Sequence, residues 1–199
     1  MTENEDQVAG LLLAAGGGRR LGGRPKALLD HRGRPLVEHA VGVLRAAGCT
    51  RVHVVLGAAA DVVRQKADLE GCVLVDNPDW AGGMGSSLRA GLESLSGTGA
   101  RAALVSLVDQ PGIGAEAFAR VRGAYTDETA LVSAAYDGVR GHPVLFGSAH
   151  WAGIAATATG DRGARAYLKE HAAEVSLVEC GDVARPYDID TVADLHHLE

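Results

Sequence analysis

The residues best suited to chemistry lie in a glycine-rich stretch near the start of the chain. An apolar run ends at Leu13, and residues 14–18 contain three consecutive glycines ahead of Arg20 and Lys26. Glycines leave backbone N–H groups free to close around phosphate oxygens, while arginine and lysine neutralise the phosphate charge. The stretch therefore predicts a cradle for a nucleoside triphosphate.

This loop matches neither of the two common phosphate-binding motifs. Ala27 follows Lys26 where the Walker A motif has serine or threonine, and Leu21 stands where the dinucleotide motif has its third glycine. No acidic residue closes a second strand at the distance that the dinucleotide motif requires, since Asp76 comes much too late. The loop is therefore predicted to bind a triphosphate through a different arrangement.

Carboxylates follow two later segments. Asp109 comes after the apolar run at 104–108, where a lone carboxylate can hold Mg²⁺ that bridges phosphates, although it could equally form a turn before a proline. Asp188 and Asp190 alternate, so they share one face of an extended segment, and one of them could instead cap a final helix. The sequence predicts a Mg²⁺ site at Asp109 and leaves the role of the later pair open.

Three further segments offer polar groups. Small residues between Asn77 and Ser87 lead into a predicted helix, which leaves N–H donors and room for a planar ring or a ribose. Arg140 and His142 begin a hairpin strand and could meet a phosphorylated acceptor, although a lone histidine is more often structural. A basic loop at 160–165 also precedes a helix, where its charges could simply be solvated.

The elements that must position these residues alternate between strands and helices. This alternation implies right-handed crossovers and a largely parallel sheet, whose carboxyl ends bring the loops to one edge. Asp137-Gly138, between two apolar runs, indicates one antiparallel hairpin. Strands are predicted at 8–13, 52–56, 72–75, 102–108, 130–135, 139–146 and 175–178, and helices at 36–47, 58–67, 115–123, 162–171, 191–198 and from Ser86 or Ser87 to 95.

Composition narrows the classes of partner. The chain of 199 residues carries a net charge of −6 and 4% aromatic residues, which argues against nucleic-acid and acidic-membrane surfaces. Residues 2–7 lack the basic start of a signal peptide, and the apolar run that follows is too short to span a bilayer. Three scattered cysteines form no metal or disulfide pattern, and Cys72 and Cys180 are expected to be buried. These features predict a cytoplasmic protein of one domain spanning residues 1–199.

Together these segments resemble the MobA-like nucleotidyltransferases, and most closely the MocA branch of molybdenum cofactor cytidylyltransferases. The resemblance covers nearly the whole chain, and the motifs occur in the family's order. Ala14-Ala15-Gly16 is similar to the cytidylyltransferase form, whereas guanylyltransferases more often have Ala-Gly-Gly there. The matching motifs are Leu13-Ala14-Ala15-Gly16 with Arg20 and Lys26, residues 83–92, Asp109-Gln110-Pro111, residues 141–146, residues 160–165 and Asp188-Ile189-Asp190-Thr191.

The resemblance implies a Rossmann-like three-layer α/β sandwich of the GT-A kind, with a mostly parallel sheet and one antiparallel hairpin. It implies Mg²⁺-dependent transfer of a nucleoside monophosphate, CMP from CTP, to a phosphorylated acceptor such as molybdopterin, with release of pyrophosphate. The implied partners are the nucleoside triphosphate, this acceptor and a molybdoenzyme, with neither nucleic acid nor membrane among them.

The family's motifs also imply roles for individual residues. Arg20, Lys26 and Asp109 would be catalytic, with Asp109 and Asp190 holding Mg²⁺. Gly18 departs from the family because many relatives carry serine there, and the chain has one extra residue before Lys26 relative to some members. The nucleotide is expected to contact Leu13, Ala14, Ala15, Gly16, Gly17, Gly18, Asn77, Gly85, Ser86 and Ser87, and the acceptor to contact Gln110, Arg140, His142 and Arg162.

Three other functions stay open. Guanylyl transfer to molybdopterin, or nucleotidyl transfer to another small phosphate, would use the same residues. A redox enzyme resembling nicotine blue oxidoreductase would need a nicotinamide cofactor, and the missing third glycine argues against that. A non-catalytic chaperone for the molybdenum cofactor could lose the metal site, so the presence of Asp109 together with Lys26 favours catalysis.

Overall fold

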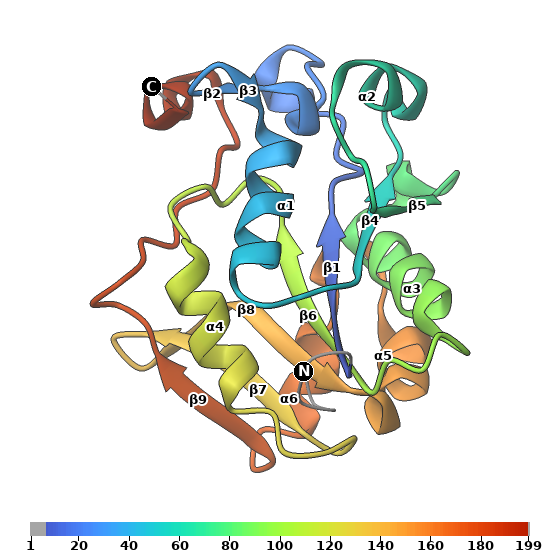
Figure 1. Cartoon of the computed structure of the whole chain (residues 1–199), viewed down its shortest axis with the longest axis vertical. Helices are drawn as coiled ribbons and strands as arrows, with labels where there is room; N and C mark the ends of the chain where they lie inside the picture. The colour runs from blue at the N-terminus through green and yellow to red at the C-terminus, as the bar shows by residue number, and fades with distance from the viewer. Residues whose placement is uncertain (1–6, 199) are drawn as a thin grey trace.

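The chain folds around one seven-stranded sheet (Figure 1). The strands are β1 Val8–Leu13, β4 Val52–Leu56, β5 Val73–Asp76, β6 Ala102–Leu107, β7 Leu131–Tyr136, β8 Val139–Gly147 and β9 Val175–Glu179. The computed structural model describes residues 7–198, so the acidic segment at 2–6 lies outside it. The order is β5-β4-β1-β6-β8-β7-β9, and β8 alone among the described strands of this sheet runs antiparallel to its neighbours.

Helices cover both faces of the sheet. In β1, Val8 and Leu12 pack on one face while Leu11 and Leu13 pack on the other, as the two-residue period of a strand requires. The first face carries α1 Leu36–Ala46, α2 Ala60–Lys66 and α4 Ala115–Gly123, and the second carries α3 Met84–Leu95, α5 Trp151–Thr157 and α6 Arg165–Glu170. None of the helices within residues 7–198 is long and apolar enough to cross a membrane. The predicted Rossmann-like three-layer α/β sandwich is confirmed.

The hairpin forms where Asp137-Gly138 predicts it. Asp137 (φ 52°) and Gly138 (φ 77°) both adopt the left-handed conformation that a two-residue type I′ turn requires. The turn carries the chain from β7 into β8, which inserts between β6 and β7, while β7 pairs in parallel with β9. One antiparallel strand therefore stands within an otherwise parallel sheet, as predicted.

The helix that follows β5 begins earlier than the sequence suggests. The helix α3 starts at Met84, and the residue before it, Gly83, has no side chain that could cap it. The Ser86 hydroxyl donates instead to the carbonyl oxygens of Asp79 and Gly83. The capping prediction for Ser86 or Ser87 is therefore wrong, and the start of α3 carries no side-chain cap.

Other differences lie in short segments. Residues 162–171 divide into a 3₁₀ turn and α6, because Gly163 interrupts them with a left-handed φ of 52°. The last predicted helix is a 3₁₀ segment over Val192–Leu198. A small hairpin of β2 Asp30–His31 and β3 Arg34–Pro35 was not predicted, since two-residue strands carry no alternating pattern.

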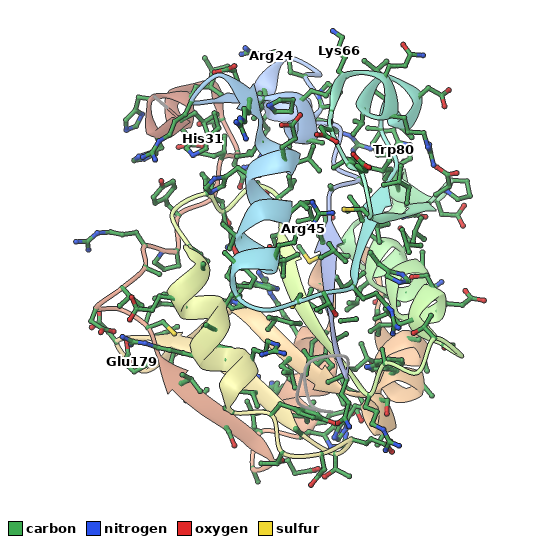
Figure 2. All side chains as sticks on the ribbon, viewed as in Figure 1. Arg24, His31, Arg45, Lys66, Trp80 and Glu179 are labelled. Atoms are coloured by element: carbon green, nitrogen blue, oxygen red, sulfur yellow. The ribbon has the colours of Figure 1, made fainter. Side chains whose placement is uncertain are left out.

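The cysteines differ in burial. Cys180 is buried as expected. Cys49 is also buried, and this burial raises the pKa of its thiol to about 11. Cys72 is only partly buried, because it lies just before the edge strand β5, where its Sγ is 3.5 Å from Arg45 Nη2. Figure 2 labels Arg45 on α1. The prediction that Cys72 is a buried thiol is therefore wrong.

Candidate active site

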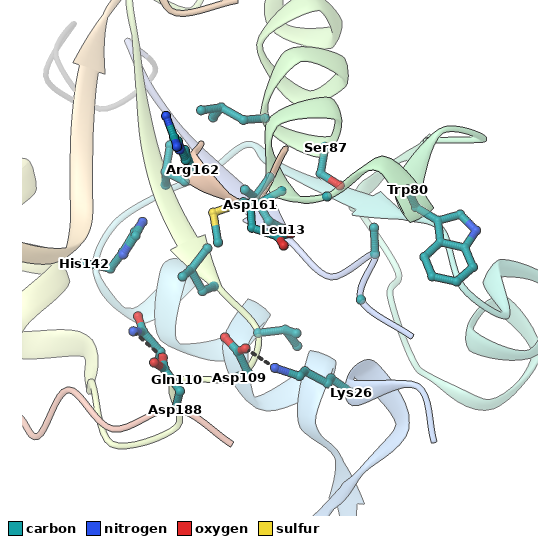
Figure 3. Close-up of a pocket in the computed structure, with 18 of the residues that line it drawn as sticks. Leu13, Lys26, Trp80, Ser87, Asp109, Gln110, His142, Asp161, Arg162 and Asp188 are labelled. Atoms are coloured by element: carbon teal, nitrogen blue, oxygen red, sulfur yellow. Dashed lines mark hydrogen bonds and ion pairs between the residues drawn. The ribbon is translucent and has the colours of Figure 1, made fainter. Parts of the chain in front are cut away.

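A cavity of about 630 Å³ opens at the carboxyl ends of β1 and β6. The helix α1, which follows β1, covers one face of the sheet, whereas α3, which precedes β6, covers the other. The strand order runs outward from this pair in opposite directions, to β4 and β5 beyond β1 and to β8, β7 and β9 beyond β6, and open α/β sheets bind ligands at such a switch point. The glycine-rich loop, the start of α3, β8 and the loop before α6 complete the wall (Figure 3).

The glycine-rich loop is folded as a tight turn. Gly18 has a left-handed φ of 60°, and its carbonyl oxygen accepts hydrogen bonds from the N–H groups of Leu21 (2.8 Å) and Gly23 (3.0 Å). A Cβ at position 18 would also clash with the carbonyl oxygen of Arg24. The serine of many family members would be strained here, so the departure at Gly18 has a local structural reason.

An aromatic side chain supports this loop. The Trp80 ring packs so closely on Gly17 that a Cβ there would lie 2.9 Å from Trp80 Cζ3. The same side chain also packs against Gly57, in the turn after β4, and lines the cavity (Figure 3). No sequence signal indicated this contact, because the three residues lie far apart in the chain.

Lys26 joins two carboxylates inside the cavity. Its Nζ lies 2.5 Å from Asp109 Oδ2 and 2.6 Å from Asp190 Oδ1, and Figure 3 draws the first of these contacts. Arg20 Nη2 lies 2.9 Å from Asp190 Oδ2. The extra residue before Lys26 therefore does not keep its side chain from the end of β6.

The charges in this cluster stabilise one another. Burial by itself lowers the pKa of Lys26, but Asp109 and Asp190 outweigh burial and the net effect raises it. The hydrogen bond from Lys26 lowers the pKa of Asp190, and the Arg20 guanidinium lowers it further. Lys26 and Asp190 are therefore both charged at neutral pH.

Asp188 is held differently from Asp190. Its Oδ1 accepts a 2.8 Å hydrogen bond from Gln110 Nε2, and burial, assisted by the charges of Asp109 and Asp190, raises its pKa. Ile189 between them is fully buried, and its N–H donates to the Asp109 carbonyl oxygen at 2.8 Å. Both carboxylates thus face the cavity, but Asp190 is the one that shares a cation with Asp109.

Other parts of the lining combine apolar and charged side chains. Leu168 lines the cavity together with three charged residues, Asp161, Arg162 and Arg165. Burial lowers the pKa of His142 to about 4. His142 is therefore neutral at pH 7 and offers a hydrogen bond rather than a positive charge.

Most of the predicted site residues line this one cavity. They are Leu13, Ala15, Gly16, Gly17, Arg20, Lys26, Ser87, Asp109, Gln110, His142, Arg162 and Asp190. Six other predicted residues lie outside its lining, namely Ala14, Gly18, Asn77, Gly85, Ser86 and Arg140.

Several of these six support the lining rather than form it. Asn77 is buried, and its Nδ2 donates to the hydroxyl groups of Ser86 (2.9 Å) and Ser87 (3.0 Å). Gly85 lets the start of α3 pack on the backbone that follows α5, where a Cβ at 85 would lie 2.7 Å from a main-chain nitrogen. Arg140, by contrast, is exposed near the tip of the hairpin, away from the cavity lining.

The lining residues that sequence reasoning missed are mostly apolar. Val144 and Phe146 of β8 line the cavity together with Val105 of β6, and Val144 pairs with Val105 in the sheet. Alternation along each strand indicates which side chains share a face. Which face meets a cavity depends on where the helices pack, and alternation says nothing about that.

The chain combines a three-layer α/β sandwich with a glycine-rich loop at its switch point and a lysine that contacts two carboxylates. This combination is typical of nucleotide-binding proteins. Residues 10–175 match the MobA-like NTP transferase domain. The chain belongs to this family, as the sequence motifs predict.

Two curated relatives are similar to this chain. Nicotine blue oxidoreductase of Paenarthrobacter nicotinovorans is 41% identical over 198 residues, which cover 96% of each chain. A probable molybdenum cofactor guanylyltransferase of Opitutus terrae is 34% identical over 122 residues, which cover 61% of this chain and 57% of the relative.

Two solved structures share the fold over nearly their whole length. The homologue of Mycobacterium tuberculosis Rv0371c from Mycobacterium sp. strain JC1 is 32% identical, with a TM-score of 0.81 and coverage of 96% of this chain and 94% of the other. Rv0371c of M. tuberculosis H37Rv in complex with manganese is 27% identical, with a TM-score of 0.72 and coverage of 96% and 97%.

Proposed function

We propose that this chain transfers a nucleoside monophosphate from a nucleoside triphosphate to a phosphorylated acceptor and releases pyrophosphate. The observation that carries the proposal is the meeting of Lys26, Asp109 and Asp190 beside the glycine-rich loop. Membership of the MobA-like NTP transferase family supports the same activity.

The acidic pair fits a divalent cation. Asp109 and Asp190 offer hard carboxylate oxygens, and one cationic nitrogen already lies within 2.6 Å of both. Mg²⁺ commonly takes one or two protein carboxylates and completes its shell with water and phosphate oxygens. No larger cluster of His, Cys, Asp or Glu suited to a metal occurs in the part of the chain that the structure describes. Bound at this pair, Mg²⁺ would neutralise charge on the phosphates, and the manganese complex of Rv0371c supports such a cation.

The basic side chains suit the electrostatic problem of this reaction. Both substrates are anions, so the barrier lies in bringing them together and in stabilising the charge of a pentacoordinate phosphorus. Arg20 and Lys26, next to the loop, would bind the triphosphate and balance the charge on the leaving pyrophosphate. An acceptor phosphate is already ionised and needs little help from a general base. His142, whose pKa is lowered by burial to about 4, would be only a weak base.

We propose CTP as the nucleotide and molybdopterin as the acceptor. Ala14-Ala15 before the glycines supports CTP, while the name of the Opitutus terrae relative makes GTP the competing nucleotide. The arginines Arg162 and Arg165, together with apolar lining residues such as Phe146 and Leu168, suit a phosphorylated ring system. A molybdoenzyme would then receive the nucleotide-bearing cofactor.

Pyrophosphate release tests this function. The assay compares CTP, GTP, UTP and ATP with Mg²⁺, each with and without molybdopterin. Release that needs both CTP and the acceptor is expected. A preference for GTP would overturn only the choice of base, whereas absence of acceptor-dependent release with every nucleotide would overturn the transferase.

A second candidate is a redox activity. It is favoured by one observation, the 41% identity, over 96% of both chains, to a protein named nicotine blue oxidoreductase. The cavity would then have to hold a nicotinamide cofactor, without the third glycine of the usual dinucleotide loop. An absorption spectrum of the purified protein, and NADH or NADPH oxidation in the presence of nicotine blue, would reveal this activity.

A further inference from the structure

Lys26 lies where a divalent cation would bind the acidic pair. Its Nζ is 2.5 Å from Asp109 Oδ2 and 2.6 Å from Asp190 Oδ1. The second oxygen of Asp190 lies 2.9 Å from Arg20 Nη2. Since Mg²⁺ needs its oxygen ligands at about 2.0–2.1 Å, it cannot share these two oxygens with an ammonium group held between them.

The cluster is also balanced in charge. Two cations, Lys26 and Arg20, face two carboxylates, Asp109 and Asp190. The Lys26 side chain is only 14% exposed. Moving its ammonium away from both carboxylates would break both ion pairs and leave a largely buried charge with only the more distant Asp188 nearby, which is strongly unfavourable unless another anion takes their place. A metal ion by itself must overcome this penalty in order to bind.

A triphosphate supplies the missing anion. The backbone N–H of Lys26 donates to the Gly16 carbonyl oxygen at 3.3 Å, and a Cβ on Gly16 would lie 3.8 Å from Lys26 Cδ. The Lys26 side chain therefore lies against the glycine-rich loop as well as against the carboxylates. Phosphates held by the loop would attract its Nζ, and Arg20, whose side chain is 68% exposed, could follow.

We propose that Lys26 blocks the metal position until a nucleoside triphosphate draws it away, so that the divalent cation binds with the nucleotide and not before it. This inference rests on the proposed function. The exchange keeps each charge paired, because Lys26 and Arg20 move to the phosphates while the cation takes Asp109 and Asp190. Lys26 thus occupies the metal position in the nucleotide-free protein and binds the triphosphate in the nucleotide complex.

Mn²⁺ binding without nucleotide, followed by electron paramagnetic resonance, tests the exchange. Lys26→Met removes the blocking charge, and Lys66→Met removes the same charge from an exposed position at the end of α2 (Figure 2). Lys26→Met should bind Mn²⁺ at least about tenfold more tightly than the wild type, while Lys66→Met should match the wild type. Lys26→Gln repeats the measurement in case the methionine variant folds poorly.

A second substitution checks that the new affinity belongs to the acidic pair. Adding Asp190→Asn to Lys26→Met should abolish the gain, because one of the two carboxylates is lost. Equal Mn²⁺ affinity in the wild type and both Lys26 variants would overturn the proposal. If the affinities are equal but the wild type still releases pyrophosphate with Mg²⁺, the proposed function stands. If Lys26→Met binds Mn²⁺ tightly but the wild type releases no pyrophosphate, the result counts against the proposed function alone.

Discussion

Among single residues, Asp109 is the one on which the proposed chemistry depends most. It follows β6, and its carbonyl oxygen accepts the Ile189 N–H while its carboxylate contacts Lys26. Backbone and side chain are thus both held by distant segments of the chain. A carboxylate fixed in this way is positioned before the substrates arrive, which is what electrostatic catalysis requires.

Asp109→Asn should lower Mg²⁺-dependent pyrophosphate release by at least about a thousandfold, because an amide cannot replace the carboxylate charge at the phosphates. Circular dichroism should show an unchanged fold. Asp61→Asn, on the exposed side of α2, serves as the matched control and should keep full activity. Full Mg²⁺-dependent release by Asp109→Asn would remove this residue from the metal site.

His142 should make stability depend on pH. Burial lowers its pKa from 6.5 to about 4, so between these values the unfolded chain binds a proton that the folded protein does not. Stability from this residue is therefore complete above about pH 6.5 and is lost as the pH falls toward 4. His142→Gln should reduce the fall in unfolding free energy between pH 7 and pH 4.5, measured with urea. The exposed His196→Gln is the control, and identical pH profiles for His142→Gln and the wild type would contradict the expectation.

Among the elements, α1 and α3 use glycine in opposite ways. Gly91 of α3 lies against β1, and a Cβ there would meet Leu11 Cδ1 at 2.6 Å. Gly42 of α1 points to open space, and a Cβ there would have no neighbour within 4 Å. The first glycine lets a helix approach the sheet, whereas the second only adds flexibility to the unfolded chain.

The same substitution should therefore have opposite effects in the two helices. Gly42→Ala should raise the free energy of unfolding by about 0.5–1 kcal/mol, because alanine favours the helix. Gly91→Ala should lower it by about 1–3 kcal/mol, because the added methyl group overpacks the contact with β1. Urea denaturation measures both, and effects of the same sign would show that packing at Gly91 does not limit the helix.

For the whole molecule, the decisive feature is that one cavity draws on loops from both halves of the sheet. The glycine-rich loop follows β1 and Asp109 follows β6, while His142 comes from the antiparallel β8. A nucleotide in this cavity would contact elements that only the folded chain brings together. Binding should therefore stabilise the native state and not the unfolded chain.

A thermal-shift screen measures this coupling. At one hundred times its Kd, a nucleotide adds about 2.7 kcal/mol of stability, which raises Tm by about 5–10 °C for a chain of this length. CTP with Mg²⁺ should give the largest shift among the four nucleoside triphosphates. The Mg²⁺-dependent part should disappear in Asp109→Asn. An unchanged Tm with all four would contradict a nucleotide-binding cavity.

The layers and the family of this protein could be predicted from its amino-acid sequence. Mostly apolar runs such as 8–13 and 52–56 predicted strands, because a strand that is covered on both faces needs apolar side chains on both. Asp137-Gly138 predicted a turn, because both residues tolerate positive φ. These features are local, so backbone geometry decides them. Ordered motifs likewise indicated the MobA-like family without any knowledge of contacts.

The roles of the individual site residues depend on contacts that form only when the chain folds. Lys26 meets Asp109 and Asp190, 83 and 164 positions further along the chain, and no local pattern predicts that one ammonium lies between both. The buried Asn77 supports the serines that follow it, and Arg140 lies outside the cavity lining. Side-chain type and spacing reveal what a residue can do, but contacts between distant segments depend on how the whole chain packs.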